Sequence, residues 1–391
     1  MIPFLRKSVF IFRFLFRYIG IILFIGIVSI FSIRLALPFL ASLEMFSNFS
    51  LLETAKENTT VINNREEIII RDDDRLDRSI QNVSNSIVYI MMQEKALTKR
   101  IFSLTGTILT TDGLLVTSFS DSLDFSETTY DIMDFDGTRF DAKFFAYDSF
   151  SHLLYLRISG DNFTPVVFAD SEDFSSGRKV IALGENDILN QNEIYFGVIK
   201  TFNPTFSLAN KVSSSTEKHQ GVFEVSFLEE KDIRSGSPVL SYTGELMGIL
   251  GTRTVGDQSF PYVLRGNDMK KSMQRVVANP SYQPPFFGAS YISITPTIAK
   301  RNDLNIESGA WLSFEQKTSP LSPVVLLGSP AQKAGFRYGD IIRSVNDISI
   351  SYENPLSNVL SNFKEKDEVT VSFVRQGIEQ KVTVVLGAQP E

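Results

Sequence analysis

Few residues in this chain are of the types that support acid–base or metal chemistry. The 391 residues include two histidines, His152 and His219, and no cysteine. Composition therefore excludes a disulfide framework, a cysteine-based zinc or iron–sulfur site, and a cluster of several histidines around a metal. Any reaction that needs a histidine base must use one of these two residues. His219 lies in the polar run Ser-Ser-Ser-Thr-Glu-Lys-His-Gln, so we expect it in a solvated loop.

One acidic run, Asp72-Asp73-Asp74, resembles a cation ligand set at first sight. It lacks the glycine and the glutamate that complete an EF-hand loop, so a solvated turn is the better prediction. We expect no metal site and no cofactor.

Charge is distributed unevenly along the chain. Residues 1–41 contain five basic residues and no acidic one. Removing these five from the 38 basic residues of the chain leaves 33 against 45 acidic ones, and the whole carries a net charge of −7. An acidic body argues against nucleic-acid binding, because phosphate contacts need basic surfaces.

The basic N-terminus leads into an apolar stretch. Tyr18–Ile33 contains no charge, and Tyr18–Phe39 reaches membrane-spanning length if Arg34 extends its side chain toward the interface. The preceding basic cluster predicts a cytoplasmic N-terminus and an extracytoplasmic body. We expect residues 1–43 to form a cytoplasmic tip and an uncleaved single-pass anchor in the cell membrane. The alternative is a signal peptide cleaved near Ala41–Ser42.

The rest of the chain is mostly short strands. Residues 44–74 are predicted to be a stalk, with a short strand at Glu67–Arg71. Residues 75–278 alternate short apolar runs with turn signals, which is typical of a β-sandwich or barrel, and a helix follows at Asp268–Val277. The clearest strands are Ser86–Met92, Gly106–Thr110, Leu114–Ser118, Lys179–Leu183, Gly221–Val225 and Glu245–Thr252.

A proline-rich linker, residues 279–285, is predicted to separate this region from a last domain at residues 286–391. There we expect strands at Val324–Leu327, Asp340–Val345, Glu368–Arg375 and Gln380–Leu386, and helices at Pro330–Ala334 and Pro355–Phe363.

The run GSPAQKAGFRYGDIIRSVND, Gly328–Asp347, resembles the PDZ domain of the bacterial HtrA/Deg family, and the match extends from about Phe286 to Leu386. The resemblance implies that the domain binds an extended C-terminal peptide as an added strand, with backbone amides holding the terminal carboxylate. The loop in the corresponding position is Phe286, Phe287, Gly288 and Ala289. The alternative is that these four residues only pack the edge of the domain.

The middle domain resembles the protease domain of the same family. DIRSGSPVLSYTGELMG, Asp232–Gly248, is similar to its nucleophile loop. Gly106–Ser118, Phe135–Ile158 and Val180–Ile199 are similar to other core segments, in the family's order. The resemblance implies a mainly β fold, in which a trypsin-like double β-barrel is followed by the PDZ domain. The transmembrane helix predicted from the apolar N-terminal stretch precedes both.

The catalytic positions of the family are altered here. Ser235 occupies the nucleophile position, Ser120 the position of the histidine base, and His152 the position of the aspartate. A serine hydroxyl without a positioned base is a weak nucleophile. In the loop that forms the oxyanion hole, Ile233 replaces a glycine and Arg234 replaces an asparagine. His152 is expected to form a hydrogen bond in a half-buried cleft, with Ser120 as its partner.

These replacements predict a membrane-anchored pseudoprotease that binds peptide C-termini or unfolded segments, as a scaffold or regulator in protein quality control. Two alternatives are an active serine endopeptidase with a Ser235–His152 dyad or another non-standard triad, and a PDZ peptide-binding module on an inert spacer. The resemblance also implies a homotrimer or an active protease relative as partner.

Overall fold

The structure is a computed structural model that describes residues 18–29, 72–94, 101–120, 123–169, 175–186, 191–207, 213–228, 233–255, 258–313 and 323–390. The chain divides into two compact units, Met1–Ile69 and Ile70–Glu391.

In the first unit, a helix covers residues 18–29. Within the described ranges, no helix is both long and apolar enough to cross a membrane. The predicted span Tyr18–Phe39 continues past residue 29 into residues outside the described ranges, and the predicted strand Glu67–Arg71 lies wholly outside them.

The second unit begins with a helix that the sequence interpretation missed. Helix α4 (Asp72–Ser84) contains the three aspartates that were predicted to form a solvated turn, so that prediction is wrong. Leu76, Ile80 and Val83 recur at helical spacing and pack against the core between the two barrels. The helix runs across the predicted boundary between residues 74 and 75.

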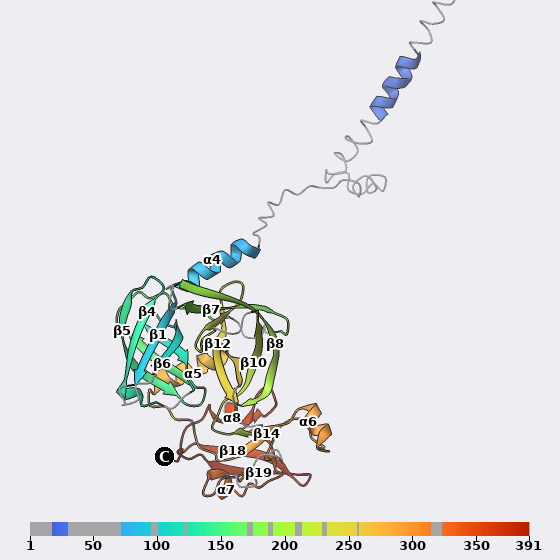
Figure 1. The fold of residues 1–391 in the computed structure, drawn as a ribbon. Helices are drawn as coiled ribbons and strands as arrows, with labels where there is room; N and C mark the ends of the chain where they lie inside the picture. Colours follow the sequence, from blue (N-terminus) through green and yellow to red (C-terminus); the bar gives the residue numbers. More distant parts are fainter. Residues whose placement is uncertain are drawn as a thin grey trace, which may run out of the picture. The chain divides into compact units, whose positions relative to one another are not determined.

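Two closed six-stranded barrels follow, as Figure 1 shows, with the first on the left and the second on the right. The strand order of the first is β1-β2-β3-β6-β5-β4. Its strands are β1 (Ile87–Glu94), β2 (Ile101–Ile108), β3 (Leu114–Ser118), β4 (Thr128–Asp134), β5 (Arg139–Asp148) and β6 (Leu153–Ile158). A short 3₁₀ helix, η3 (Phe125–Glu127), precedes β4.

The second barrel has the order β10-β13-β12-β11-β7-β8 and ends in helix α5 (Gly266–Ala278). Its strands are β7 (Lys179–Asn186), β8 (Gln191–Ser207), β10 (Gln220–Phe227), β11 (Pro238–Leu240), β12 (Leu246–Val255) and β13 (Gln258–Arg265). Apolar side chains from both barrels and from α5 share one core, so the barrels and the helix pack as one body.

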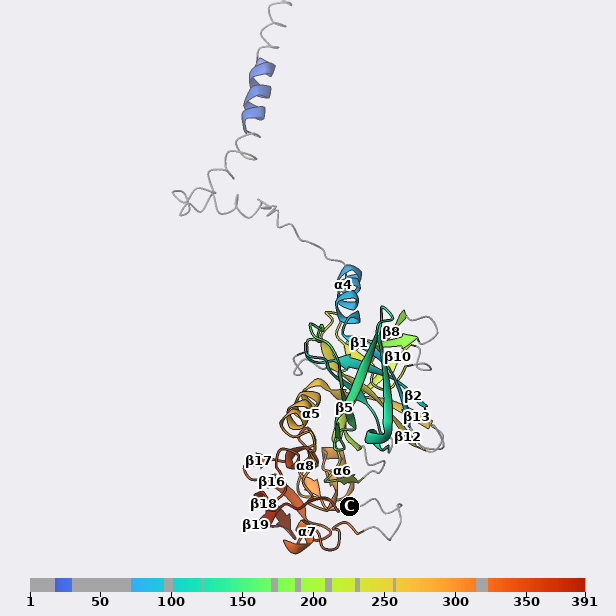
Figure 2. The ribbon, with the colours of Figure 1, turned by 90° about the vertical axis from the view of Figure 1, so that its left-hand side faces the viewer.

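The C-terminal module has its own core beneath a sheet. Its strands are β14 (Ser290–Ser293), β15 (Ala310–Trp311), β16 (Ile341–Val345), β17 (Ile348–Ser349), β18 (Glu368–Arg375) and β19 (Ile378–Val385), and its helices are α6 (Pro296–Arg301), α7 (Pro330–Lys333) and α8 (Leu356–Leu360). Figures 1 and 2 both show α8 on the side of the module that faces the barrels.

One strand of this sheet comes from the barrel region. Strand β9 (Ser214–Ser215), which lies between β8 and β10 in the chain, pairs antiparallel with β14. The sequence interpretation did not predict it. The predicted strand at Val324–Leu327 is wrong, because the segment forms only an isolated bridge between Val325 and Ala289.

Candidate functional site

The loop that carries Ser235 lies against the first barrel. The amide of Thr105 donates to the carbonyl of Ser235 at 3.2 Å. The next residue, Gly236, has a φ of +89°, and a Cβ there would lie 2.0 Å from the Thr105 carbonyl oxygen and 2.1 Å from Thr117 Oγ1. Only glycine accommodates both this backbone angle and this contact. The position of Ser235 is therefore fixed by its neighbour.

The hydroxyl of Ser235 is directed to a threonine. Its Oγ donates a hydrogen bond to Thr252 Oγ1 at 3.0 Å, and the residue is half-buried. Among the described residues, no imidazole, amine or carboxylate forms a hydrogen bond with this oxygen. A general base must lie within hydrogen-bond reach of the proton that it removes, and within the described residues the partner of this hydroxyl is a threonine.

Ser120, at the predicted base position, is exposed and follows the end of β3. The amide of Phe119 donates to the carbonyl of His152 at 3.0 Å, so Ser120 and His152 lie on adjoining strand ends. The predicted hydrogen bond between these two side chains is not among the bonds of the described residues. The imidazole has a different partner.

That partner is a lysine. His152 Nε2 lies 3.3 Å from Lys218 Nζ, while His152 Nδ1 is buried without a hydrogen-bond partner in the described part of the chain. Burial, together with the positive charge of Lys218, lowers the pKa of His152 to about 4. A neutral imidazole accepts from the ammonium group, and within the described residues it forms no hydrogen bond with Ser235.

The turn that holds His152 is fixed by a buried carboxylate. Asp148 is fully buried and accepts hydrogen bonds from the Phe150 amide, Ser151 Oγ, Ser272 Oγ and Arg275 Nη2. Burial alone would raise its pKa, but the Arg275 guanidinium and these donors hold the pKa of Asp148 below its usual range. Ser272 and Arg275 belong to α5, so the helix anchors the turn.

Ile233 and Arg234 are both used for packing. Ile233 packs against the core of the second barrel. The Arg234 guanidinium lies over the ring of Tyr89 in the first barrel, 5.3 Å from the ring centroid, within the limit of about 6 Å for a cation–π contact. These side chains seal the loop onto both barrels.

A segment that the sequence interpretation treated as a solvated loop connects these parts. We call Ser214–Gln220 the bridging segment. Lys218 Nζ donates to the carbonyl of Ser149 at 3.0 Å. His219 is 2% exposed, with Nε2 3.2 Å from Asp268 Oδ2 in α5 and its ring against that of Phe150. The prediction of a solvated His219 is therefore wrong.

The bridging segment also reaches the loop predicted to bind peptide carboxylates. The amides of Phe287 and Gly288 donate to Glu217 Oε1 at 3.1 and 2.9 Å. Gly288 has a φ of +81°, and a Cβ there would lie 2.3 Å from Ser329 Cβ. Phe286 pairs with Gly387, and Ala289 donates to Thr216 Oγ1 at 3.1 Å.

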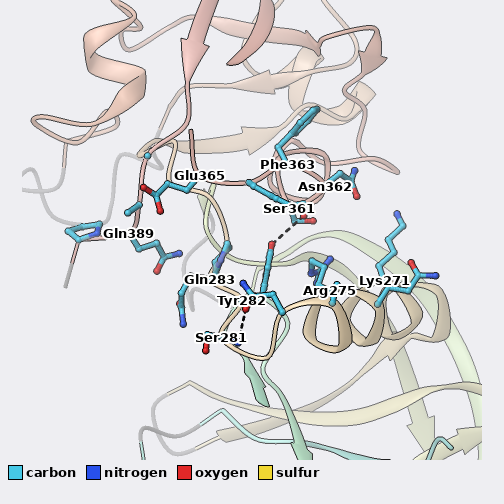
Figure 3. A pocket seen from close by; sticks show the side chains of 18 residues that line it. Lys271, Arg275, Ser281, Tyr282, Gln283, Ser361, Asn362, Phe363, Glu365 and Gln389 are labelled. Carbon is cyan, nitrogen blue, oxygen red and sulfur yellow. Dashed lines mark hydrogen bonds between the residues drawn. The ribbon is translucent and has the colours of Figure 1, made fainter. Parts of the chain in front are cut away.

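A pocket of about 850 Å³ lies between α5, the proline-rich linker and the C-terminal module. Figure 3 shows Arg275 and Lys271 from the helix on one side and Phe363 and Glu365 on the other. Tyr282 crosses it, donating to the carbonyl of Ser361 at 3.3 Å. No residue of the predicted site lines this pocket, so it is separate from Ser235 and from the carboxylate loop.

Two closed barrels with a serine loop between them, followed by a small module with a carboxylate-binding loop, define a class of protein: a trypsin-like peptidase fold joined to a PDZ domain. Comparison with known proteins agrees. Residues 104–249 match the family model of the trypsin-like peptidase domain, and residues 311–386 match that of the PDZ domain. With these two domains in this order, the chain is similar to HtrA-type proteins, which join a trypsin-like peptidase domain to a C-terminal PDZ domain.

The relatives are distant. "Serine protease Do-like HtrA" of Bacillus subtilis (strain 168) is 27% identical over 266 residues, which cover 66% of this chain and 57% of the relative. "Serine protease Do-like HtrB" of the same strain is 26% identical over 265 residues, covering 64% and 54%. The alignment thus spans little more than half the length of these relatives. The solved structure "HtrA-type protease AlgW with tripeptide" has a TM-score of 0.61 at 15% identity, covering 81% of this chain and 98% of that one.

Sequence reasoning missed the bridging segment. Its residues are serine, threonine and charged side chains without an apolar alternation, and this composition gives no strand signal. Its pairing depends on backbone groups and on a carboxylate, which only the folded chain brings to the PDZ domain.

Proposed function

We propose that this chain is a catalytically inactive HtrA-type protein that binds the C-terminal ends of peptides or unfolded segments through its PDZ domain, as a scaffold or regulator in protein quality control. The name of one solved relative records a bound tripeptide, which supports peptide recognition as the family activity retained here. In this proposal the chain retains peptide binding and has lost peptide cleavage.

One observation supports the proposed loss of cleavage. Ser235 Oγ donates to Thr252, whereas the imidazole of His152 contacts Lys218. A serine protease needs the opposite arrangement, in which an imidazole accepts the serine proton and a carboxylate orients that imidazole. With Ser120 in the base position, no group that can accept a proton at neutral pH occupies that place.

Labelling with a fluorophosphonate probe tests this directly, together with cleavage of an unfolded substrate such as reduced, alkylated lactalbumin. We expect neither labelling nor cleavage by the wild-type chain. Labelling of the wild type that disappears in Ser235→Ala would overturn the proposal, and would favour an active endopeptidase with a non-standard triad.

Restoring the family's residues supplies the matching gain-of-function test. The variant Ser120→His/His152→Asp/Ile233→Gly should be labelled and should cleave the substrate at least about a hundredfold faster than wild type, because a positioned base contributes that much or more. The same variant with Ser235→Ala is the control. Circular dichroism checks that all variants fold.

We further propose that the domains lie outside the cytoplasm and that residues 1–43 anchor the chain in the membrane. The basic cluster before an apolar stretch supports the anchor, and names such as "Probable periplasmic serine endoprotease DegP-like" support the location. Alkaline carbonate extraction of membranes and protease accessibility in spheroplasts measure both. Light scattering of the purified chain measures whether it forms the homotrimer that the family resemblance implies.

A further inference from the structure

The carboxylate-binding loop of the PDZ domain already holds a carboxylate. Both loop amides, of Phe287 and Gly288, donate to the same oxygen of Glu217. Two backbone donors converging on one carboxylate oxygen is the arrangement by which such loops capture the end of a peptide chain. Here the carboxylate belongs to a side chain of the same molecule.

The residues before Glu217 lie on β14 as a peptide would. Ser215 pairs with Ser290 and Ser214 with Tyr291, antiparallel. One step nearer to the loop, the Thr216 amide donates to the Ala289 carbonyl at 3.0 Å, while the Ala289 amide donates to Thr216 Oγ1 at 3.1 Å. The segment thus combines an added strand with a carboxylate at its loop end, which is the strand-addition mode of peptide recognition.

Helix α8 holds the other end of the segment. Asn358 accepts from the Gln220 amide at 3.1 Å and donates to the Gln220 carbonyl at 2.9 Å, while Ser293 donates to the Gln220 side chain at 3.1 Å. The segment therefore contacts both β14 and α8 of the PDZ domain. These contacts leave no room for a second strand beside β14.

We propose that Ser214–Glu217 is a built-in ligand of the PDZ domain, and that an external peptide end binds only by displacing it. This inference rests on the proposed function of the domain in peptide binding. The competing partner is an extended peptide with a free α-carboxylate, which takes the place of the Glu217 side chain on the amides of Phe287 and Gly288.

An external peptide can bind more favourably than the segment at the position of Ser214. The Ser214 hydroxyl is buried and has no hydrogen-bond partner within the described residues. Burying an unpaired hydroxyl is unfavourable, and an apolar side chain in the same place avoids this penalty. When the C-terminal residue of a peptide takes the place of Thr216, the residue two before it takes the place of Ser214. A peptide with valine there should compete better than a peptide with serine.

A disulfide trap tests whether the segment occupies the groove in solution. Because Thr216 and Ala289 form a hydrogen-bonded pair, the adjacent pair Ser215–Ser290 is a non-hydrogen-bonded one, where side chains are close enough for a disulfide. The chain contains no cysteine, so the double variant Ser215→Cys/Ser290→Cys introduces its only two thiols. Oxidation should form the intramolecular disulfide in most molecules, detected by mass spectrometry. Each single variant is the control.

Peptide binding tests the competition. The probe is a fluorescein-labelled peptide, Lys-Val-Ser-Val-Ser-Thr with a free carboxylate, measured by fluorescence anisotropy on the full chain. Glu217→Ala should bind it about tenfold tighter than wild type or more, because the internal ligand loses both charge-assisted hydrogen bonds. Replacing the exposed Glu353 by alanine is the matched control and should change nothing. The amidated probe should bind weakly to every variant.

The two experiments distinguish a failure of the built-in ligand from a failure of peptide binding itself. A trapped disulfide, probe binding blocked in the oxidised protein and restored by reduction, and tighter binding by Glu217→Ala together support it. No disulfide, with equal binding by wild type and Glu217→Ala, overturns it while leaving peptide binding in place. A disulfide in Ser215→Cys/Ser290→Cys, without probe binding by Glu217→Ala, overturns both the competition and the proposed peptide binding, and makes the segment a structural strand.

Discussion

His152, which the sequence places at the position of the family's aspartate, takes its contacts in the structure from a lysine and a buried turn. It has a φ of +56°, a left-handed conformation that histidine tolerates better than most residues. Its ring is held between a buried turn and the ammonium group of Lys218, so its neutral form is favoured. A neutral imidazole is chemically a potential base, but its Nε2 contacts Lys218, and within the described residues neither ring nitrogen forms a hydrogen bond with Ser235.

The lowered pKa of His152, about 4 against 6.5 for an ordinary histidine, predicts a pH dependence of stability. Between these values the unfolded chain binds a proton at His152 and the folded chain does not. The free energy of unfolding therefore has its full value above pH 6.5. It decreases as the pH falls toward 4, by up to about 3 kcal/mol. In His152→Asn, which tolerates the same φ, the free energy of unfolding should fall less over this window.

Urea unfolding of both proteins at a series of pH values measures the difference. All other titratable groups are present in both proteins, so the difference between them reports the substitution at position 152. Equal pH dependence of the two proteins between pH 6.5 and 4 would contradict the prediction. The chemical shift of the His152 Cε1 proton reports the same pKa independently.

The roles of Ser120, His152 and Ser235 are predictions from the sequence, made possible by the family motifs with fixed spacing that surround each of them. Their partners could not. Thr252 is on β12 and Lys218 is in the bridging segment, and neither has any fixed spacing from the residue that it contacts. Contacts of this kind depend on how the two barrels and the PDZ domain pack, which local sequence does not encode.

At the scale of elements, the serine loop is held by contact between backbones. Gly236 brings the loop of the second barrel against strands β2 and β3 of the first, where Thr117 Oγ1 also donates to the Thr105 carbonyl at 2.7 Å. The loop thus joins the two barrels through a close backbone contact.

Gly236→Ala should therefore destabilise the protein by at least about 3 kcal/mol, since it adds a clash with backbone atoms to the strain of a positive φ. Gly177 is the matched control: its φ is +85°, and a Cβ there would meet nothing within 4 Å. Gly177→Ala should cost only about 1 kcal/mol. Thermal and urea unfolding give both values, and similar losses for the two variants would show that the close contact has no energetic role.

Elements with a strong local signal could be predicted. Strands β3 and β18 have the predicted bounds, Leu114–Ser118 and Glu368–Arg375, because each is rich in β-branched or apolar residues between turn signals. Helix α4 and strand β9 could not be predicted. Helix α4 begins with three aspartates and has few apolar residues. Strand β9 consists of two serines, and only their pairing with β14 makes them a strand.

At the scale of the whole second unit, the bridging segment joins three parts of the fold. It contacts the turn of the first barrel through Lys218, α5 through His219, and the PDZ domain through Glu217 and Gln220. The proline-rich linker is the covalent connection between the barrels and the PDZ domain, and the segment adds a second, non-covalent one. The placement of the PDZ domain should therefore depend on side chains far from the linker.

Asn358 is the side chain that tests this dependence most directly. It is 8% exposed, and its amide group forms two hydrogen bonds with the backbone of Gln220. Asn358→Ala leaves a buried backbone donor and acceptor unpaired, which costs about 1–3 kcal/mol for each group. Because this loss falls on the contact between domains, the PDZ domain should detach more often while its own core stays folded.

Small-angle scattering should then give a larger radius of gyration for Asn358→Ala, and limited proteolysis should cut faster within residues 279–285. Asn354→Ala is the matched control: Asn354 lies in the same domain but donates to Ser349 within it, so neither measurement should change. The melting of the PDZ core, followed by hydrogen exchange in β18, should be alike in both variants. An unchanged radius of gyration in Asn358→Ala would mean that the remaining contacts of the bridging segment suffice to hold the PDZ domain, and that Asn358 does not control its placement.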